Sequence, residues 1–190
     1  MSKRVGFMMD IESLDLGPNS VVTQIAFVAY DLDDPEIIYR EVEEYLPIQP
    51  QIALSRTINA DTIIWWMQQD DKARARFEAN RGSDMEELIA LVGSVATKMA
   101  AVIEECSEYE VWARGPQFDM VNVESLMLAC GVQTPWKYDR VRDLRTVMEL
   151  ANVHTKDIPL PAGLVQHVAL SDCKYQIVCL TESLRALRRS

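Results

Sequence analysis

Acidic side chains at three separate places in the chain could act together in one site. Asp10 and Glu12 lie two residues apart at the end of an apolar run, and alternate residues of a strand point to the same face. Asp119 lies near the start of an expected helix, where the helix dipole favours a negative charge. His167 precedes Asp172 by five residues. These two side chains can converge if His167 lies on a loop and Asp172 in the first turns of the next helix.

Four carboxylates and one histidine suit a particular chemistry. Hard divalent cations such as Mg²⁺ and Mn²⁺ take oxygen ligands. Two such ions, about 3.5–4 Å apart, can activate a water and stabilise the leaving oxygen in phosphodiester hydrolysis. Histidine suits the base that takes the proton of that water. Each element alone has a structural explanation, such as a solvated strand end for the D-x-E pair, but the set together predicts a metal-dependent hydrolytic site.

Local patterns predict the elements that position these groups. Apolar and β-branched runs predict strands over 5–10, 21–30, 41–46 and 110–113. Ser83 followed by Glu86 forms a capping-box pattern, and apolar spacing from Met85 to Ile103 predicts a helix after it. Further helices are expected over 119–130, 143–151 and 168–188, with a loop containing proline and glycine over 152–166. This order predicts a single α/β domain over 1–190, with a central mixed β-sheet flanked by helices.

Composition limits the classes of protein to consider. Hydrophobic residues make up 48% of the 190 residues and charged residues 25%, which is typical of a globular protein. No apolar run approaches the roughly 20 residues that a membrane span needs, and the four cysteines form no CxxC pair. We therefore expect reduced cysteines and a cytoplasmic protein that does not bind membranes. The net charge of −10 argues against a passive DNA-binding module, but less against a nuclease whose metal ions contact the phosphate.

The three acidic elements resemble, in order and spacing, the motifs of the DEDDh 3′–5′ exonucleases. DIE ends the first expected strand, FD lies at the start of the expected helix at 119–130, and H-x4-D spans the start of the last helix. The segments TIIWWMQQDDKAR, WARGPQFDMVNVESL and PWKYDRVRDLRT resemble those of phage-encoded DexA-type exonucleases and related bacterial 3′–5′ exoribonuclease-like proteins. The resemblance runs from about Gly6 to Leu184 and implies a ribonuclease-H-like fold.

The resemblance also implies a function. It implies a two-metal-ion 3′–5′ exonuclease that releases nucleoside 5′-monophosphates from the 3′ end of single-stranded DNA. Asp10, Glu12, Asp119 and Asp172 would hold two Mg²⁺ or Mn²⁺ ions, and His167 would be the general base. The resemblance to phage-encoded exonucleases favours DNA as the substrate. The alternative is an exoribonuclease or oligonucleotidase that acts on RNA 3′ ends. A non-catalytic binding protein on a nuclease fold is a further alternative. A phage-encoded enzyme would work in the host-cell cytoplasm. Related exonucleases include dimers, so a homodimer is a further possibility.

Several further residues are candidates for substrate binding. Ser13 and Leu14 follow Glu12 where the backbone of the family meets the terminal nucleotide, and Phe118 precedes Asp119. Trp65 and Trp66 are adjacent, so at most one of them can stack on a base, and we assign this role to Trp66. Arg142, in the basic segment that also holds Arg145, is expected to contact a phosphate, and an internal Arg–Asp pair that holds the fold is the alternative.

Overall fold

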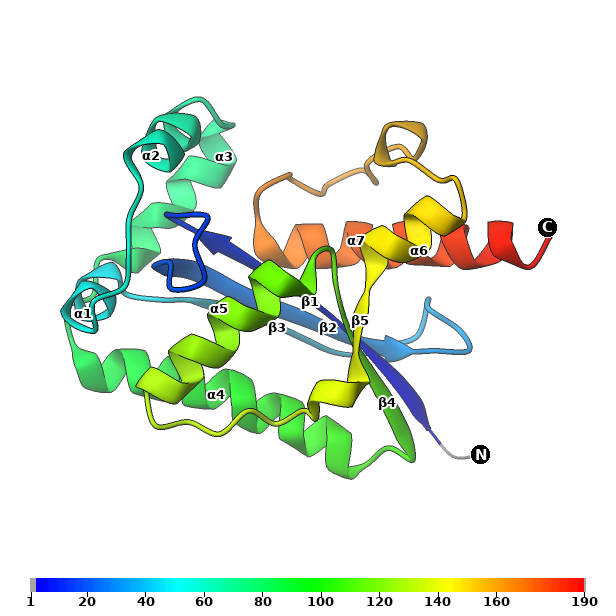
Figure 1. Ribbon diagram of the computed structural model, residues 1–190, viewed down its shortest axis with the longest axis horizontal. Helices are drawn as coiled ribbons and strands as arrows, with labels where there is room; N and C mark the ends of the chain where they lie inside the picture. The colour runs from blue at the N-terminus through cyan, green and yellow to red at the C-terminus, as the bar shows by residue number, and fades with distance from the viewer. Residues whose placement is uncertain (1–2, 190) are drawn as a thin grey trace.

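A computed structural model describes residues 3–189 and places the strands in one five-stranded sheet (Figure 1). The strand order is β3-β2-β1-β4-β5. The strands are β1 (Arg4–Ser13), β2 (Val22–Asp31), β3 (Ile38–Tyr45), β4 (Glu108–Ala113) and β5 (Val141–Asp143). β1 pairs antiparallel with β2, and β2 with β3, whereas β4 is parallel to both β1 and β5. The sheet is therefore mixed, as the sequence predicts.

Helices cover both faces of this sheet (Figure 1). α4 (Met85–Glu104) and α5 (Pro116–Ala129) pack on one face, and α6 (Leu144–Leu150) and α7 (Ala169–Leu187) pack on the other. The short helices are α1 (Ile48–Ala53), α2 (Ala60–Met67), α3 (Asp71–Arg74), η1 (Ala75–Asn80), η2 (Tyr138–Arg140) and η3 (Thr155–Asp157). Of these, α2 and α3 lie beyond the end of β1 (Figure 1), so they can contribute to a site there.

The central strand β1 directs its side chains alternately into the two helix layers. Phe7, Met9 and Ile11 belong to the core under α4 and α5, whereas Met8 belongs to the core under α7. The same alternation turns Asp10 and Glu12 towards α7. A β-bulge follows Glu12, because the register with β2 shifts between Glu12 and Ser13. Bulges of this kind often end strand pairing beside active sites.

Two local expectations need correction. The N-cap of α4 is Asp84, whose Oδ1 accepts a hydrogen bond from the Glu86 amide at 2.8 Å, and not Ser83. An aspartate one residue later accepts from the Glu86 amide instead, so the pattern predicts the helix but not its cap. α5 begins at Pro116 rather than at Asp119, because Pro116 takes the first helical position after the left-handed Gly115.

Two further features concern the cysteines and the lengths of the apolar helices. The free cysteines are Cys106, Cys130, Cys173 and Cys179, and the last three are buried. Across residues 3–189, we find no helix with both the length and the apolar character needed to cross a membrane.

Candidate active site

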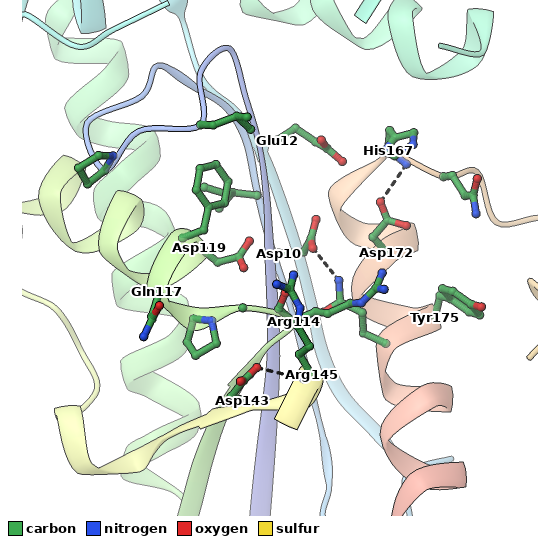
Figure 2. Close-up of a pocket in the computed structure, with 18 residues that line it drawn as sticks. Asp10, Glu12, Arg114, Gln117, Asp119, Asp143, Arg145, His167, Asp172 and Tyr175 are labelled. Atoms are coloured by element: carbon green, nitrogen blue, oxygen red, sulfur yellow. Dashed lines mark hydrogen bonds between the residues drawn. The ribbon is translucent and has the colours of Figure 1, made fainter. Parts of the chain in front are cut away.

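A cleft of about 830 Å³ at the end of β1 collects the five predicted residues (Figure 2). β1 contributes Asp10 and Glu12, and the first turn of α5 contributes Asp119. His167 lies on the loop before α7, and Asp172 lies in the first turn of that helix. Three segments that are distant in sequence therefore meet at one end of the sheet.

The end of the last loop has a specific backbone geometry at His167. His167 adopts a left-handed conformation with φ 61°, which is uncommon for residues other than glycine. Its backbone amide donates a hydrogen bond of 2.9 Å to Asp172 Oδ2. One ligand atom from each of Glu12, His167 and Asp172 lies within 4.8 Å of the others. The five-residue spacing thus brings the imidazole and the carboxylate to the same place.

Side chains of the sheet hold the start of α7. The Ala169 amide donates to Gln24 Oε1 at 3.2 Å, and the Leu170 amide donates to Glu43 Oε1 at 3.4 Å. The first amides of a helix have no partner within the helix. Gln24 on β2 and Glu43 on β3 supply those partners, and so fix the position of Asp172 relative to β1.

Burial raises the pKa values of the four carboxylates, and repulsion between them adds to the rise at Asp10 and Glu12. Burial, and then the charges of Asp119, Glu12 and Asp172, raise the pKa of Asp10 well above its ordinary value of 3.8. Burial, followed by the charges of Asp172 and Asp119, likewise raises the pKa of Glu12. Burial raises the pKa of Asp119 to about 7 and that of Asp172 to about 6. Four acids that repel one another are expected to be stabilised by a bound cation.

The donor set fits divalent metal ions. Within residues 3–189, no lysine or arginine forms an ion pair with any of these four carboxylates. The ligand atoms available are carboxylate oxygens and an imidazole nitrogen, which suit Mg²⁺ or Mn²⁺ better than soft metals. The site therefore has the oxygen and nitrogen ligands that a divalent metal centre requires.

Gln176 is a residue of the site that the sequence analysis missed. Its Nε2 donates a hydrogen bond of 2.6 Å to Asp10 Oδ1, and its side chain lines the cleft. Gln176 follows Asp172 by four residues on α7, so the two side chains lie on the same helix face. That spacing is the signal that could have identified it.

A second cavity, of about 510 Å³, adjoins the cleft. Both spaces are lined by Ile11, Glu12, Leu16 and Phe118. The second is also lined by Ser13, which was predicted, and by the two tryptophans. Its apolar and aromatic side chains share the lining with Asn59, Asp61 and Thr62, and the space is large enough for a nucleobase.

The two tryptophans, of which Trp66 was predicted to stack on a base, differ in exposure. Trp66 is 3% exposed, and its indole Nε1 donates to the Ser13 carbonyl at 2.9 Å. Trp65 is 41% exposed, and its ring lies 4.8 Å from the ring of His167. The surface open to a ligand therefore belongs to Trp65, because Trp66 is held in the core beside Phe77.

Two other residues predicted to contact substrate lie outside both cavities. Leu14 is 4% exposed in the core and lines neither the cleft nor the second cavity, and its backbone bonds to Val21 and Asn59. Arg142 does not line the cleft, because its Nη1 donates to the carbonyl of Asp139 at 2.7 Å. Its Nε also lies 3.6 Å from a Glu110 carboxylate oxygen. The arginines in the cleft are Arg114 and Arg145.

Comparison with known proteins identifies the family. A family model described as the 3′–5′ exoribonuclease Rv2179c-like domain matches residues 5–184. The chain belongs to this family. It is also 24% identical over 209 residues to an exodeoxyribonuclease of Enterobacteria phage T4, with 94% of this chain and 88% of the relative covered.

Solved structures share the fold of this Rv2179c-like chain. The nuclease domain of 3′hExo, a DEDDh family member bound to rAMP, matches with a TM-score of 0.59 at 13% identity, covering 96% of this chain and 92% of that one. Exonuclease X in complex with 5′ overhanging duplex DNA matches with a TM-score of 0.52 at 13% identity, covering 95% and 91%. The ExoI/SSB-Ct complex matches with a TM-score of 0.60 at 12% identity, and the chain spans only 43% of its length.

These findings confirm the expected class of enzyme. The Rv2179c-like chain is a nuclease, a hydrolase of phosphodiester bonds, with 3′–5′ exonuclease activity. The predicted ribonuclease-H-like fold is confirmed by the mixed sheet and by these neighbours. The carboxylates and the imidazole that meet in the cleft fit the divalent metal ions expected from the sequence.

Proposed function

We propose that this enzyme hydrolyses single-stranded DNA from its 3′ end by a two-metal-ion mechanism and releases nucleoside 5′-monophosphates. The observation that carries the proposal is the meeting of four carboxylates and His167 in one cleft, next to an aromatic cavity. Such a cavity beside the reacting centre suits an unpaired terminal base. The whole chain would work as one exonuclease domain.

The carboxylates would bind the metal ions. Asp10, Glu12, Asp119 and Asp172 would hold two Mg²⁺ or Mn²⁺ ions, with Asp10 placed at the centre by its bond to Gln176. When bound, the ions would lower the pKa of a water molecule and offset the charge of the phosphate. Each carboxylate must be ionised to bind metal, so the raised pKa values of these groups predict that metal binding releases protons.

His167 would take the proton from the attacking water. Partial burial lowers its pKa from the ordinary value of 6.5, so the imidazole is neutral and able to accept a proton near pH 7. The hydrogen bond from its backbone amide to Asp172 keeps the ring close to the metal ligands. The ring of Trp65 packs against it and limits access of bulk water from that side.

The second cavity would receive the terminal base. Trp65 offers an exposed indole, and Phe118 lines both the cavity and the cleft. Stacking of a base on such a side chain contributes about 1–3 kcal/mol and depends little on sequence. The enzyme would therefore act on 3′ ends whose last base is unpaired.

DNA is the proposed substrate because the phage T4 relative, which aligns with 94% of this chain, is named an exodeoxyribonuclease. RNA is the second candidate. The description of the family as 3′–5′ exoribonuclease-like favours it, as does the rAMP bound to the structural neighbour 3′hExo. The two differ at the 2′-hydroxyl of the terminal nucleotides, so substrates of identical base sequence decide between them.

The test uses 5′-labelled single-stranded DNA and RNA of the same sequence, with Mg²⁺ or Mn²⁺. A ladder of products that shortens from the 3′ end and requires metal supports the proposal. Faster cleavage of RNA than of DNA would show that RNA is the substrate. Asp10→Ala and His167→Ala should abolish or strongly reduce cleavage. The exposed Glu149 and His154 supply matched controls, because Glu149→Ala and His154→Ala remove the same groups outside the cleft. No cleavage of long or very short oligonucleotides by folded protein would refute the proposal.

A further inference from the structure

Two arginines line the cleft together with the carboxylates (Figure 2). Arg114 directly follows β4, and Arg145 lies in the first turn of α6. Among the described residues that line this cleft, they are the only lysines or arginines. Their position is notable in a chain with a net charge of −10, because they give an acidic cleft one positively charged side.

Within residues 3–189 neither guanidinium forms an ion pair with an acid. The charge of Arg145 opposes the rise in the pKa of Asp119, and the charge of Arg114 opposes the rise in the pKa of Asp172. Arg145 Nη2 donates to the carbonyl oxygen of Arg114 at 3.2 Å. The neighbouring carboxylate of Asp143 caps α6 instead, accepting from the Arg145 backbone amide at 3.0 Å and from Thr146 Oγ1 at 2.6 Å. The side chain of Arg114 forms no hydrogen bond or ion pair within the described chain. Both cations are therefore available to an anionic ligand.

The backbone gives Arg145 the space it occupies. Gly115 connects β4 to α5 with φ 118°, and a Cβ there would lie 3.3 Å from Arg145 Nη2. A side chain at this position would be strained and would press on the guanidinium. The glycine thus allows the arginine to cross the β4–α5 connection and reach the cleft.

The location of the arginines indicates which phosphate they meet. The second cavity shares Glu12 with the cleft but contains neither arginine. In Figure 2, Asp10 lies between Glu12 on one side and the two arginines on the other. A strand with its terminal base in the second cavity and its scissile phosphate at Asp10 therefore continues towards Arg114 and Arg145.

We propose that Arg114 and Arg145 bind the phosphate one nucleotide 5′ of the scissile linkage. The inference rests on the proposed function and adds a phosphate subsite to it. Guanidinium groups form strong, charge-assisted hydrogen bonds with phosphate oxygens. This contact offsets the repulsion between nucleic acid and an acidic enzyme, and it makes cleavage of oligonucleotides more efficient than cleavage of an isolated phosphodiester.

The test compares two substrate changes with one protein change. The substrates are a single-stranded hexanucleotide with an ordinary second linkage from the 3′ end, the same strand with an uncharged methylphosphonate there, and the p-nitrophenyl ester of thymidine 5′-monophosphate. The protein change is Arg114→Gln with Arg145→Gln, and Arg81→Gln, an exposed arginine outside the cleft, is the control.

We expect the double variant to raise KM for the hexanucleotide about tenfold or more. The methylphosphonate should raise KM of the wild type by a similar factor and leave the variant unchanged. Hydrolysis of the p-nitrophenyl ester, which has no second phosphate, should be the same in wild type and variant. Arg145→Lys, which keeps the charge, should recover part of the loss.

Two results would overturn the subsite. In the first, the increase in KM caused by the double variant and the increase caused by the methylphosphonate multiply when they are combined. That result would show that the arginines and the second phosphate make separate contacts. In the second, hydrolysis of the p-nitrophenyl ester falls as far as that of the hexanucleotide, which shows a role at the scissile phosphate or in the fold. If the wild type hydrolyses none of these substrates, the proposed function fails by itself. The subsite is then tested by binding alone. The affinities of the two hexanucleotides are measured for His167→Ala protein that has both arginines and for His167→Ala protein that also carries the two arginine substitutions. Equal affinity in all four combinations refutes the subsite.

Discussion

Gln176 on α7 donates a hydrogen bond of 2.6 Å from Nε2 to Oδ1 of Asp10 on β1. This hydrogen bond links the last helix to the central strand at the middle of the acidic site. The Oε1 atom of Gln176 is buried and has no hydrogen-bond partner in the described chain. An ionised Asp10 can only accept hydrogen bonds, so the amide nitrogen must face it. Burial and neighbouring charges raise the pKa of Asp10, and the hydrogen bond from Gln176 offsets part of that rise.

Removing this amide should weaken the metal site rather than the fold. We expect Gln176→Leu to raise the Mg²⁺ concentration needed for half-maximal activity about tenfold, because residues that orient metal ligands typically contribute 10- to 100-fold. The thermal midpoint should change little, since leucine keeps the volume and removes the unpaired Oε1. Titration of activity with Mg²⁺ measures this. An unchanged titration curve would show that Asp10 is held by other contacts.

The acidic site should make the metal-free protein less stable as the pH rises. The pKa of Asp119 is about 7 in the fold, against an ordinary value of 3.8. Between these values the folded protein holds a proton that the unfolded chain has lost, so stability is greater at low pH and falls as the pH rises through 7. We expect metal-free Asp119→Asn protein to melt about 5 °C higher than the wild type near pH 8, and to be inactive.

The measurement is thermal unfolding with a chelator at about pH 5.5 and about pH 8. The gap between wild type and Asp119→Asn should narrow at the lower pH, where Asp119 is protonated. Asp139→Asn, at an exposed aspartate, should show no gap at either pH. A wild type that is more stable than Asp119→Asn near pH 8 without metal would contradict the electrostatic argument.

Adding metal should reverse this pH dependence. Mg²⁺ or Mn²⁺ binds ionised carboxylates, so its stabilising effect should be larger near pH 8 than near pH 5.5. The raised pKa of Asp172, about 6, works in the same direction. Melting curves over a metal titration at the two pH values test this. Equal stabilisation at both would mean that the ions bind elsewhere.

His167 should control the acid side of the pH–rate profile. A base must be unprotonated, so at saturating metal the rate should fall as the pH drops through the pKa of His167, with a midpoint below 6.5 because burial lowers that pKa. We expect His167→Ala to lower kcat by about 10²–10⁴-fold and to remove this limb. The profile of His154→Ala should match the wild type. A limb that persists in His167→Ala would assign the proton acceptor to another group.

Substitution of Trp65 should weaken substrate binding, whereas substitution of Trp66 should lower the stability of the fold. Trp65→Ala should raise KM for single-stranded oligonucleotides about tenfold with little change in stability, because it removes a stacking surface that is 41% exposed. Trp66→Ala should cost about 3–5 kcal/mol of folding free energy, because it empties a buried site and leaves the Ser13 carbonyl without its donor. Steady-state kinetics and denaturant unfolding of both variants distinguish the roles. A normal KM in Trp65→Ala would exclude stacking.

The order of elements and the five polar residues of the cleft could be predicted from the sequence. Strand and helix periodicities are local, so β1, β2 and α4 appear at nearly the predicted places. The acidic set is recognisable because its residue types and order are themselves the pattern, and D-x-E on a strand must place both carboxylates on one face. The spacing from His167 to Asp172 required a loop before a helix, which the structure contains.

Only the tertiary structure decided which neighbouring side chains reach the site. Trp65 and Trp66 are adjacent in sequence, but burial of one against Ser13 and Phe77 turns only the other towards solvent. Arg142 and Arg145 share a basic segment, but pairing of β5 with β4 directs Arg142 to backbone carbonyls and Glu110, while Arg145 enters the cleft from α6. These outcomes depend on packing between segments far apart in the chain, which local periodicity does not encode.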